Sequence, residues 1–139
     1  MYVDSNIFLL AATHMGKRGE ACREMIVSIN RGEVKVSSSC IVIDEVLWIL
    51  KRKVGKDAAL RIVKAMLSLP IRWVPYDNDI VIRSIDIFER TKLDPRDAIH
   101  LATMRDSGLS TIVSEDSDFD RISGIERVRA GECLSRVGL

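Results

Sequence analysis

Short apolar runs alternate along the chain with longer segments in which apolar residues recur at helical spacing. The short runs predict strands at residues 2–3, 34–36, 71–75, 111–114 and 126–129. The longer segments predict helices at residues 7–12, 17–30, 41–50, 57–68, 77–91 and from 95 onward. No Asn-Gly or Asp-Gly turn joins two strands. The pattern therefore predicts an α/β fold with a central parallel sheet and helices on both faces.

Some segments carry a weaker pattern. The three serines at 37–39 are expected to form a turn that caps the next helix, and the residues after 129 are expected to form an irregular tail. In the helix at 77–91, Ile80, Val81, Ile85 and Phe88 fall at helical spacing and predict its packed face.

Size and composition set outer limits on the interpretation. The chain has 139 residues, 47% hydrophobic and 29% charged, and we assign residues 1–139 to one globular domain. A formal net charge of +1 gives no general attraction for nucleic acid. Three cysteines without a C-x-x-C pair indicate free thiols in a reducing compartment. No apolar run approaches the roughly 20 residues that span a bilayer, and no basic leader precedes the first strand, so we expect a cytoplasmic protein.

Acidic residues follow the predicted strands where polar sites of parallel sheets form. Asp4 follows the first strand, and Asp116 and Asp118 follow the strand at 111–114. Asp97 lies in the first turn of the helix that begins at Pro95. The carboxyl ends of parallel strands meet near the point where the strand order reverses. We therefore expect these carboxylates to converge.

Clustered carboxylates repel one another unless a cation lies between them. Oxygen ligands without His or Cys favour Mg²⁺ or Mn²⁺, which can activate water for attack on a phosphodiester. Two simpler interpretations stay open. Asp4 could only cap the first helix, and Asp44 and Glu45, which interrupt an apolar helix, could face solvent.

Four segments together resemble the PIN-domain family of nucleases, in particular the VapC-type toxins and their archaeal relatives. These segments are Val3-Asp4-Ser5-Asn6, Asp44-Glu45-Val46, the run from Asp94 to Ala102, and Ser114-Glu115-Asp116-Ser117-Asp118-Phe119. Their order and spacing cover the chain from residue 1 to about 130. The resemblance implies a five-stranded parallel sheet and cleavage of single-stranded RNA with Mg²⁺ or Mn²⁺.

The resemblance also implies roles for individual residues. It implies catalytic acids at Asp4, Glu45, Asp97 and Asp116, with Asp4, Asp97 and Asp116 as metal ligands. Asp118 would be an accessory acid, and Ser114 and Asn6 would orient the others. By family analogy, the protein would be a homodimeric toxin of a type II, VapBC-type system, inhibited by a cognate antitoxin.

Several residues keep two interpretations. Asp94 is expected to cap its helix, and His100 is either a partner of the acids or a packed core histidine. The basic stretch from Lys51 to Lys64 is either a solvated helix face or a surface for a phosphate backbone. Trp48 and Trp73 are expected in the core.

Three rival functions remain. One is an RNA-processing nuclease of the same family without an antitoxin, and another is a catalytically silent RNA-binding module. The third is a receiver-type phosphoacceptor domain, which also clusters acids on a parallel sheet. That domain needs a lysine near the last strand, and residues 125–139 contain none.

Overall fold

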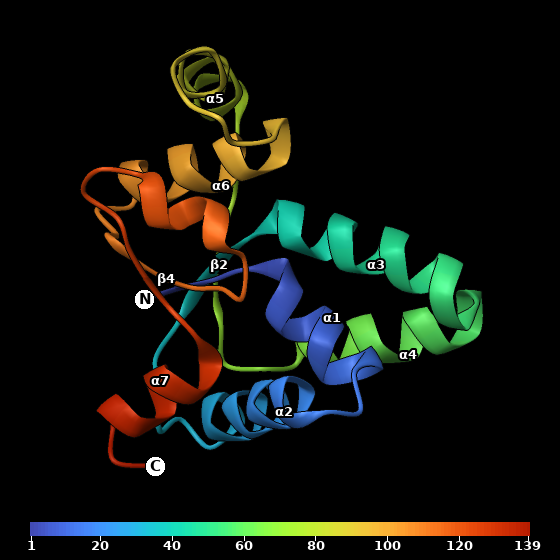
Figure 1. Cartoon of the computed structure of the whole chain (residues 1–139). Helices are drawn as coiled ribbons and strands as arrows, with labels where there is room; N and C mark the ends of the chain where they lie inside the picture. Colours follow the sequence, from blue (N-terminus) through green and yellow to red (C-terminus); the bar gives the residue numbers. More distant parts are fainter.

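Five parallel strands form one central sheet in the order β3-β2-β1-β4-β5 (Figure 1). The structure is a computed structural model that describes all 139 residues. The strands are β1 (Tyr2–Val3), β2 (Ser37–Ser39), β3 (Arg72–Val74), β4 (Thr111–Val113) and β5 (Glu126–Val128). All four strand pairings are parallel, which confirms the predicted α/β fold.

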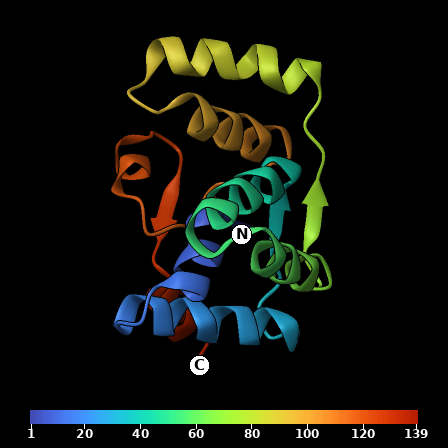
Figure 2. The same ribbon diagram turned by 90° about the vertical axis from the view of Figure 1, so that its right-hand side faces the viewer.

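Helices cover both faces of the sheet (Figures 1 and 2). They are α1 (Ser5–Thr13), α2 (Lys17–Asn30), α3 (Cys40–Val54), α4 (Lys56–Leu67), α5 (Asn78–Arg90), α6 (Pro95–Asp106) and α7 (Ala130–Arg136), with a short 3₁₀ helix η1 (Ser117–Arg121). Successive strand residues point to opposite faces. Thus Tyr2 and Ile112 join the core under α5 and α6, whereas Val3 and Val113 join the core formed with α1 to α4 and α7. None of the helices combines the length and the apolar character needed to span a bilayer.

The second strand differs from the prediction. It consists of Ser37–Ser39, not residues 34–36, and all three serines are buried. The strand pairs with β1 and β3, and the Ser38 hydroxyl donates to the carbonyl oxygen of Val3 at 2.7 Å. Because a hydrogen-bonded hydroxyl can be buried without a large free-energy cost, serine fits a central strand here. Ser39 still caps α3, since its side chain accepts a hydrogen bond from the backbone of Ile41.

The expected irregular tail is also wrong, because residues 130–136 form α7. The Glu132 side chain accepts a hydrogen bond from the Arg129 backbone at 3.0 Å and so supports the start of the helix. The helix buries Ala130, Cys133 and Leu134 against the core that includes α2. These few apolar residues form a pattern that is too short to predict a helix from the sequence.

Two predictions about the core need correction. In α5 the packed face is formed by Ile80, Ser84 and Ile87, and Ile85 and Phe88 are 61% and 48% exposed. A small serine allows close contact with α6, whereas the pattern of large residues favoured another face.

The second correction concerns Trp48, which is 49% exposed on α3. That helix is apolar around much of its circumference, so periodicity did not distinguish its buried face. The buried side is formed by Ile41, Val42, Glu45, Val46 and Leu50.

The strand order reverses between β1 and β4, which are neighbours in the sheet. Tyr2 is aligned with Ile112 and Val3 with Val113, and the backbone N–H of Asp4 donates to the Val113 carbonyl at 3.1 Å. The residues that follow both strands therefore lie side by side at the carboxyl edge of the sheet, where open α/β sheets form their sites.

Candidate active site

Asp4 is held in place by three side-chain hydrogen bonds. Its Oδ2 accepts from Asn6 Nδ2 at 2.6 Å and from Ser114 Oγ at 2.7 Å, and its Oδ1 accepts from Ser5 Oγ at 3.2 Å. Asp4 occupies the N-cap position of α1, yet its side chain accepts no capping hydrogen bond. Capping therefore does not explain this carboxylate, which is only 4% exposed.

Ser114 connects the ends of β1 and β4. Its fully buried Oγ donates to Asp4 and accepts from Asn6 Nδ2 at 2.8 Å and from the Asp116 backbone at 3.0 Å. Asn6 adds a further link, because its Oδ1 accepts from the Glu115 backbone at 3.1 Å. Together these bonds fix the orientation of the Asp4 carboxylate relative to the loop that carries Asp116.

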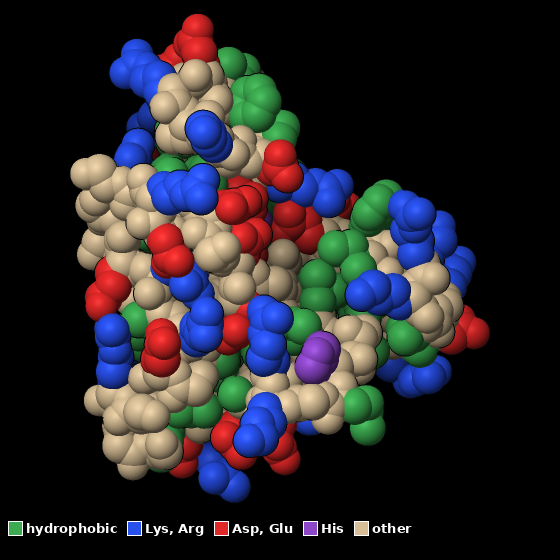
Figure 3. Space-filling model, in the orientation of Figure 1, with side chains coloured by type: hydrophobic (Ala, Val, Ile, Leu, Met, Phe, Trp, Pro, Cys, Tyr) green, Lys and Arg blue, Asp and Glu red, His purple; other side chains and the backbone are tan.

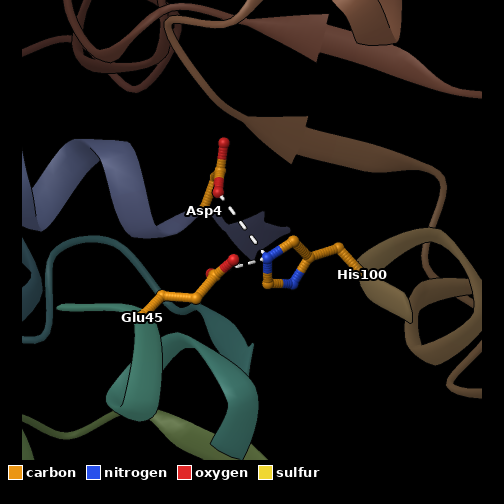
Figure 4. Close-up of side chains that lie close together, drawn as sticks. All are labelled: Asp4, Glu45 and His100. Atoms are coloured by element: carbon orange, nitrogen blue, oxygen red, sulfur yellow. Dashed lines mark hydrogen bonds and ion pairs between the residues drawn. The ribbon is translucent and has the colours of Figure 1, made fainter. Parts of the chain in front are cut away.

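Glu45 reaches the same edge from α3 and contacts His100 from α6 (Figure 4). His100 Nε2 lies 2.9 Å from Glu45 Oε2 and 4.0 Å from Asp4 Oδ1. On the other side of the ring, Nδ1 lies 2.7 Å from the Tyr2 hydroxyl. Asp4, Glu45 and His100 each offer one potential metal-ligand atom, and these three atoms all lie within 4.8 Å of one another.

The pKa shifts of Glu45 and His100 indicate what His100 does in the site. Burial is the largest influence on Glu45 and acts to raise its pKa, but the hydrogen bond and charge of His100 together with Ser5 and Arg96 outweigh it, so the pKa is lowered and the carboxylate is ionised. Burial is also the largest influence on His100 and acts to lower its pKa, but the bond to Glu45 and the charges of the nearby carboxylates together raise it. These shifts favour an ion pair, in which both ring nitrogens donate: Nε2 to Glu45, and Nδ1 to the hydroxyl of Tyr2, whose pKa is raised well above 10.0 by burial and by Asp4. Both ring nitrogens are used, so His100 orients Glu45.

Sequence reasoning left His100 between two interpretations and missed Tyr2. The position of His100 one turn after Asp97 was a usable signal. Tyr2 had none, since its partner is 98 residues away and an aromatic residue in a strand is ordinary.

Asp97 lies in the first turn of α6 and is partly buried. It lines a cavity of about 400 Å³ together with Glu45, Asp94, Pro95 and Arg96. Burial and the negative charge of Asp4, with smaller effects of Asp116 and Glu45, raise its pKa to about 7. The negative charges of neighbouring acids therefore reach Asp97, as expected for one shared pocket.

Asp4 is affected in the same way. Its pKa is raised, first by burial and also by the charge of Glu45, against the opposing effects of His100 and Ser114. No lysine or arginine forms an ion pair with any of the four predicted catalytic acids. On the molecular surface, Asp and Glu side chains gather near the middle of one face, between α6 and α3, with Lys and Arg side chains around them (Figure 3).

The acids of the loop after β4 have different environments. Asp116 is half-buried, and its Oδ1 accepts from the Asp118 backbone at 2.9 Å, which caps η1. The Asp118 side chain is exposed and lines a separate cavity with Arg121 and residues 90–93. Asp120 pairs with Arg127 through contacts of 2.6 and 2.9 Å. Only Asp116 of these three acts on the pKa of Asp97.

Two other acids lie at the margin of the site. Asp44 is exposed, so the solvent-facing interpretation applies to it and not to its buried neighbour Glu45. Asp94 occupies the N-cap position of α6, before Pro95, but its side chain makes no capping hydrogen bond. The backbone conformation begins the helix there without help from the carboxylate.

A five-stranded parallel sheet with buried acids at its reversal point defines the chain as an α/β protein with a carboxylate site. The family model of the PIN domain matches residues 1–125, and the chain belongs to this family. No curated protein sequence matches the chain.

Solved structures of VapC-type proteins share this fold. VapC20 of Mycobacterium tuberculosis, described as a sarcin–ricin loop cleaving toxin, has a TM-score of 0.72 at 21% identity, over 86% of this chain and 92% of that one. The DNA-bound VapBC of Salmonella typhimurium has a TM-score of 0.70 at 18% identity, covering 93% and 96%. VapBC2 of Rickettsia felis, bound to a promoter DNA fragment, has a TM-score of 0.71 at 12% identity, covering 92% and 96%. At these low sequence identities, the structural similarity establishes the fold of this chain.

Proposed function

We propose that this protein is a metal-dependent endoribonuclease that cleaves single-stranded RNA as the toxin of a VapBC-type pair. The observation that carries the proposal is the gathering of acidic side chains, without an arginine or lysine ion pair, at the sheet edge of a PIN-family chain. We further propose that residues 1–139 act as one domain, because α7 extends the same core beyond the matched residues. A cytoplasmic location is part of the proposal.

The side chains fit a hard divalent cation. Asp4 and Asp97 have raised pKa values, first because both are buried and also because other carboxylates lie near them, and the ligand atoms that they offer are oxygens. Asp4, Asp97 and Asp116 would hold Mg²⁺ or Mn²⁺. When bound, such an ion would supply Lewis-acid activation and offset the charge that develops on the phosphodiester.

The remaining residues orient and exchange protons. Glu45 stays ionised through its bond with His100 and is suited to accept a proton from the attacking water at its free carboxylate oxygen. Ser114 and Asn6 fix the direction of the Asp4 carboxylate. Tyr2 fixes the imidazole ring from the opposite side, so the base is held by a chain of buried hydrogen bonds.

The test is cleavage of labelled single-stranded RNA with Mn²⁺ or Mg²⁺ by the wild type and by Asp97→Asn. We expect the wild type to cut and Asp97→Asn to lose most activity, and EDTA to stop the wild type. Asp44→Asn is a matched control, because this exposed acid lies next to Glu45 in sequence and should be dispensable. Equal cleavage by wild type and Asp97→Asn, or undiminished cleavage in EDTA, would overturn the assignment.

An apolar groove supports the proposed antitoxin partner. It has a volume of about 530 Å³ between α1, α2 and α4 and is lined by Phe8, Ala11, Ala12, Arg23, Ile26, Val27, Ile62, Ala65, Met66 and Leu69. Some of the solved structures of similar fold are toxin–antitoxin complexes. We propose that an apolar antitoxin segment occupies this groove while an arginine of the antitoxin pairs with the acids.

This part of the proposal has its own experiment. The neighbouring gene product should co-purify with the wild type, and Val27→Asp should abolish the complex. Val54→Asp is the control, since Val54 is similarly exposed but lies outside the groove. An Arg→Ala change in the partner should restore cleavage. If no partner binds while RNA is cut, the processing nuclease without an antitoxin becomes the better assignment.

The proposed homodimer has a candidate interface on α5. Ile82, Ile85 and Phe88 are 61%, 61% and 48% exposed and, three residues apart, form one stripe outside the packed face. A second copy related by a twofold axis can cover this stripe with its own, because the same surface meets itself in such a dimer. Contiguous exposed apolar residues of this kind are typical of interfaces.

A further inference from the structure

Trp48 is placed unusually for a large aromatic residue. It is 49% exposed on α3 and lies three residues after Glu45, so the two side chains share one side of the helix. The indole therefore lies directly beside the acidic pocket. Because the indole fills no part of the core, core packing does not explain why a tryptophan occupies this position.

Two arginines lie over this indole. The guanidinium carbon of Arg52 is 4.8 Å from the ring centroid and that of Arg96 is 5.5 Å away. Arg52 comes from the same helix, whereas Arg96 comes from α6, where it precedes Asp97 and lines the cavity with Glu45. Both arginines are exposed, and neither forms an ion pair with a carboxylate. Their hydrogen-bond donors therefore remain available to a ligand.

We propose that Trp48, Arg52 and Arg96 form a subsite for the nucleotide next to the scissile phosphate, with the base stacked on the indole and the phosphate bound by the guanidinium groups. This inference rests on the proposed nuclease function, whose reacting phosphate would lie at the acids. It gives a role to Trp48 and Arg96, and for Arg52 it selects the phosphate-binding interpretation of the basic stretch.

The energies favour exchange of a guanidinium for a base. An exposed cation–π contact is weak, so a base that stacks well can displace the guanidinium from the ring. The displaced guanidinium then meets a phosphate, which it can bind through paired donors. The positive charge also offsets the repulsion between RNA and the acids, which a neutral stacking surface could not do.

A protein partner is the other possible occupant of an exposed tryptophan. RNA is favoured because the surface is cationic and adjoins the acidic cavity, whereas the apolar groove lies between α1, α2 and α4. The apolar stripe on α5 includes none of these three residues. The subsite thus has the composition of a single-stranded nucleic-acid surface, an aromatic platform with flanking cations.

The experiment uses a fluorescein-labelled single-stranded RNA of about ten nucleotides and the Asp97→Asn protein in Mg²⁺, in which cleavage is suppressed. Adding Trp48→Ala should weaken binding about 5- to 150-fold, the loss expected for one stacked base, and Trp48→Phe should weaken it less. Arg52→Gln and Arg96→Gln should each lower the salt dependence of binding by about one phosphate contact. Arg31→Gln, at the exposed end of α2, is the control and should change nothing.

Tryptophan fluorescence provides a second test of whether a base stacks on Trp48. Trp73→Phe leaves Trp48 as the only tryptophan, and RNA should then quench its emission, whereas an abasic oligomer of the same length should not. Unchanged RNA affinity of Trp48→Ala would overturn the subsite, and loss of the dimer in that variant would assign the indole to a protein interface. If the wild type cuts RNA but Trp48 has no effect, only the subsite fails. If Trp48 is quenched but no RNA is cut, only the nuclease function fails.

Discussion

The hydroxyl of Ser114 donates a hydrogen bond to Asp4 Oδ2 at 2.7 Å, although 110 residues separate them in the chain. The contact exists because β1 and β4 are parallel neighbours that end at the same level. Ser114 thereby couples the acid after one strand to the loop after the other, whose Asp116 backbone donates to the same hydroxyl. The geometry of the carboxylates depends on a residue that carries no charge.

Ser114→Ala should therefore weaken the proposed metal site without removing a ligand. Residues that orient metal ligands typically contribute about 10- to 100-fold to affinity or activity. We expect a loss of this size in Mn²⁺ affinity, measured by titration calorimetry, and a parallel loss in RNA cleavage. Ser28→Ala is the control, because Ser28 is a buried serine on α2 outside the site. An unchanged Mn²⁺ affinity in Ser114→Ala would show that Asp4 needs no such support.

His100→Ala should destabilise the fold strongly. It would leave Glu45 buried without its partner and open a cavity beside Tyr2. Removing one member of a buried ionic pair typically costs about 3–5 kcal/mol, which urea denaturation would measure as a lower free energy of unfolding. Thr103→Ala, at another fully buried position of α6, should cost only about 1 kcal/mol. Similar losses in the two variants would argue against a special role for the His100–Glu45 contact.

Ile85→Glu should separate the proposed dimer. The substitution places a charge in the exposed stripe of α5, where a second copy would bury it without a partner. We expect a monomer by sedimentation equilibrium and an unchanged unfolding temperature under conditions where wild type is also monomeric. Val54→Glu, a substitution at an exposed apolar position outside α5, should leave the assembly intact. A wild type that sediments as a monomer at all concentrations would refute the proposed interface.

The sequence was sufficient to predict the parallel sheet and the convergence of Asp4 and Asp116. Both depend on local patterns, namely apolar strands that end in acids, combined with a general rule about parallel sheets. Glu45 could not be separated from Asp44 in this way. Neighbouring residues on a helix point about 100° apart, and the apolar residues around them were too numerous to define which one is buried.

The remaining errors share a cause, which is that polarity alone does not determine burial. Ser38 is fully buried because its hydroxyl finds a backbone acceptor on β1, a partner that exists only once the sheet has formed. Trp48 is exposed although its neighbours are apolar. The bond between Tyr2 and His100 joins residues 98 apart in the chain, and no spacing rule predicts it.

The stability of Asp97→Asn distinguishes a shared acidic pocket from a helix-supporting acid. In the folded protein, burial and Asp4 raise the pKa of Asp97 from 3.8 to about 7, while Asp116 and Glu45 add to the effect and His100 opposes it. A raised pKa means that the group's contribution to stability is complete below pH 3.8 and is lost as the pH rises through 7. In EDTA at pH 8, the free energy of unfolding of Asp97→Asn should therefore be higher than that of the wild type. The expected gain is on the order of 1 kcal/mol for one relieved like-charge contact. At pH 5 the gain should be smaller.

Excess Mn²⁺ should reverse this ranking. A ligand at a hundredfold excess over its Kd stabilises the wild type by about 2.7 kcal/mol, whereas the variant binds weakly and gains less. If Asp97 served mainly the positive end of α6, Asp97→Asn would instead cost up to about 1 kcal/mol at pH 8, with or without metal. Thermal melts of both proteins in EDTA and in Mn²⁺, at pH 5 and pH 8, separate these cases by sign. A variant that melts below the wild type by the same margin in EDTA and in Mn²⁺ would mean that this carboxylate serves the helix and not a cation.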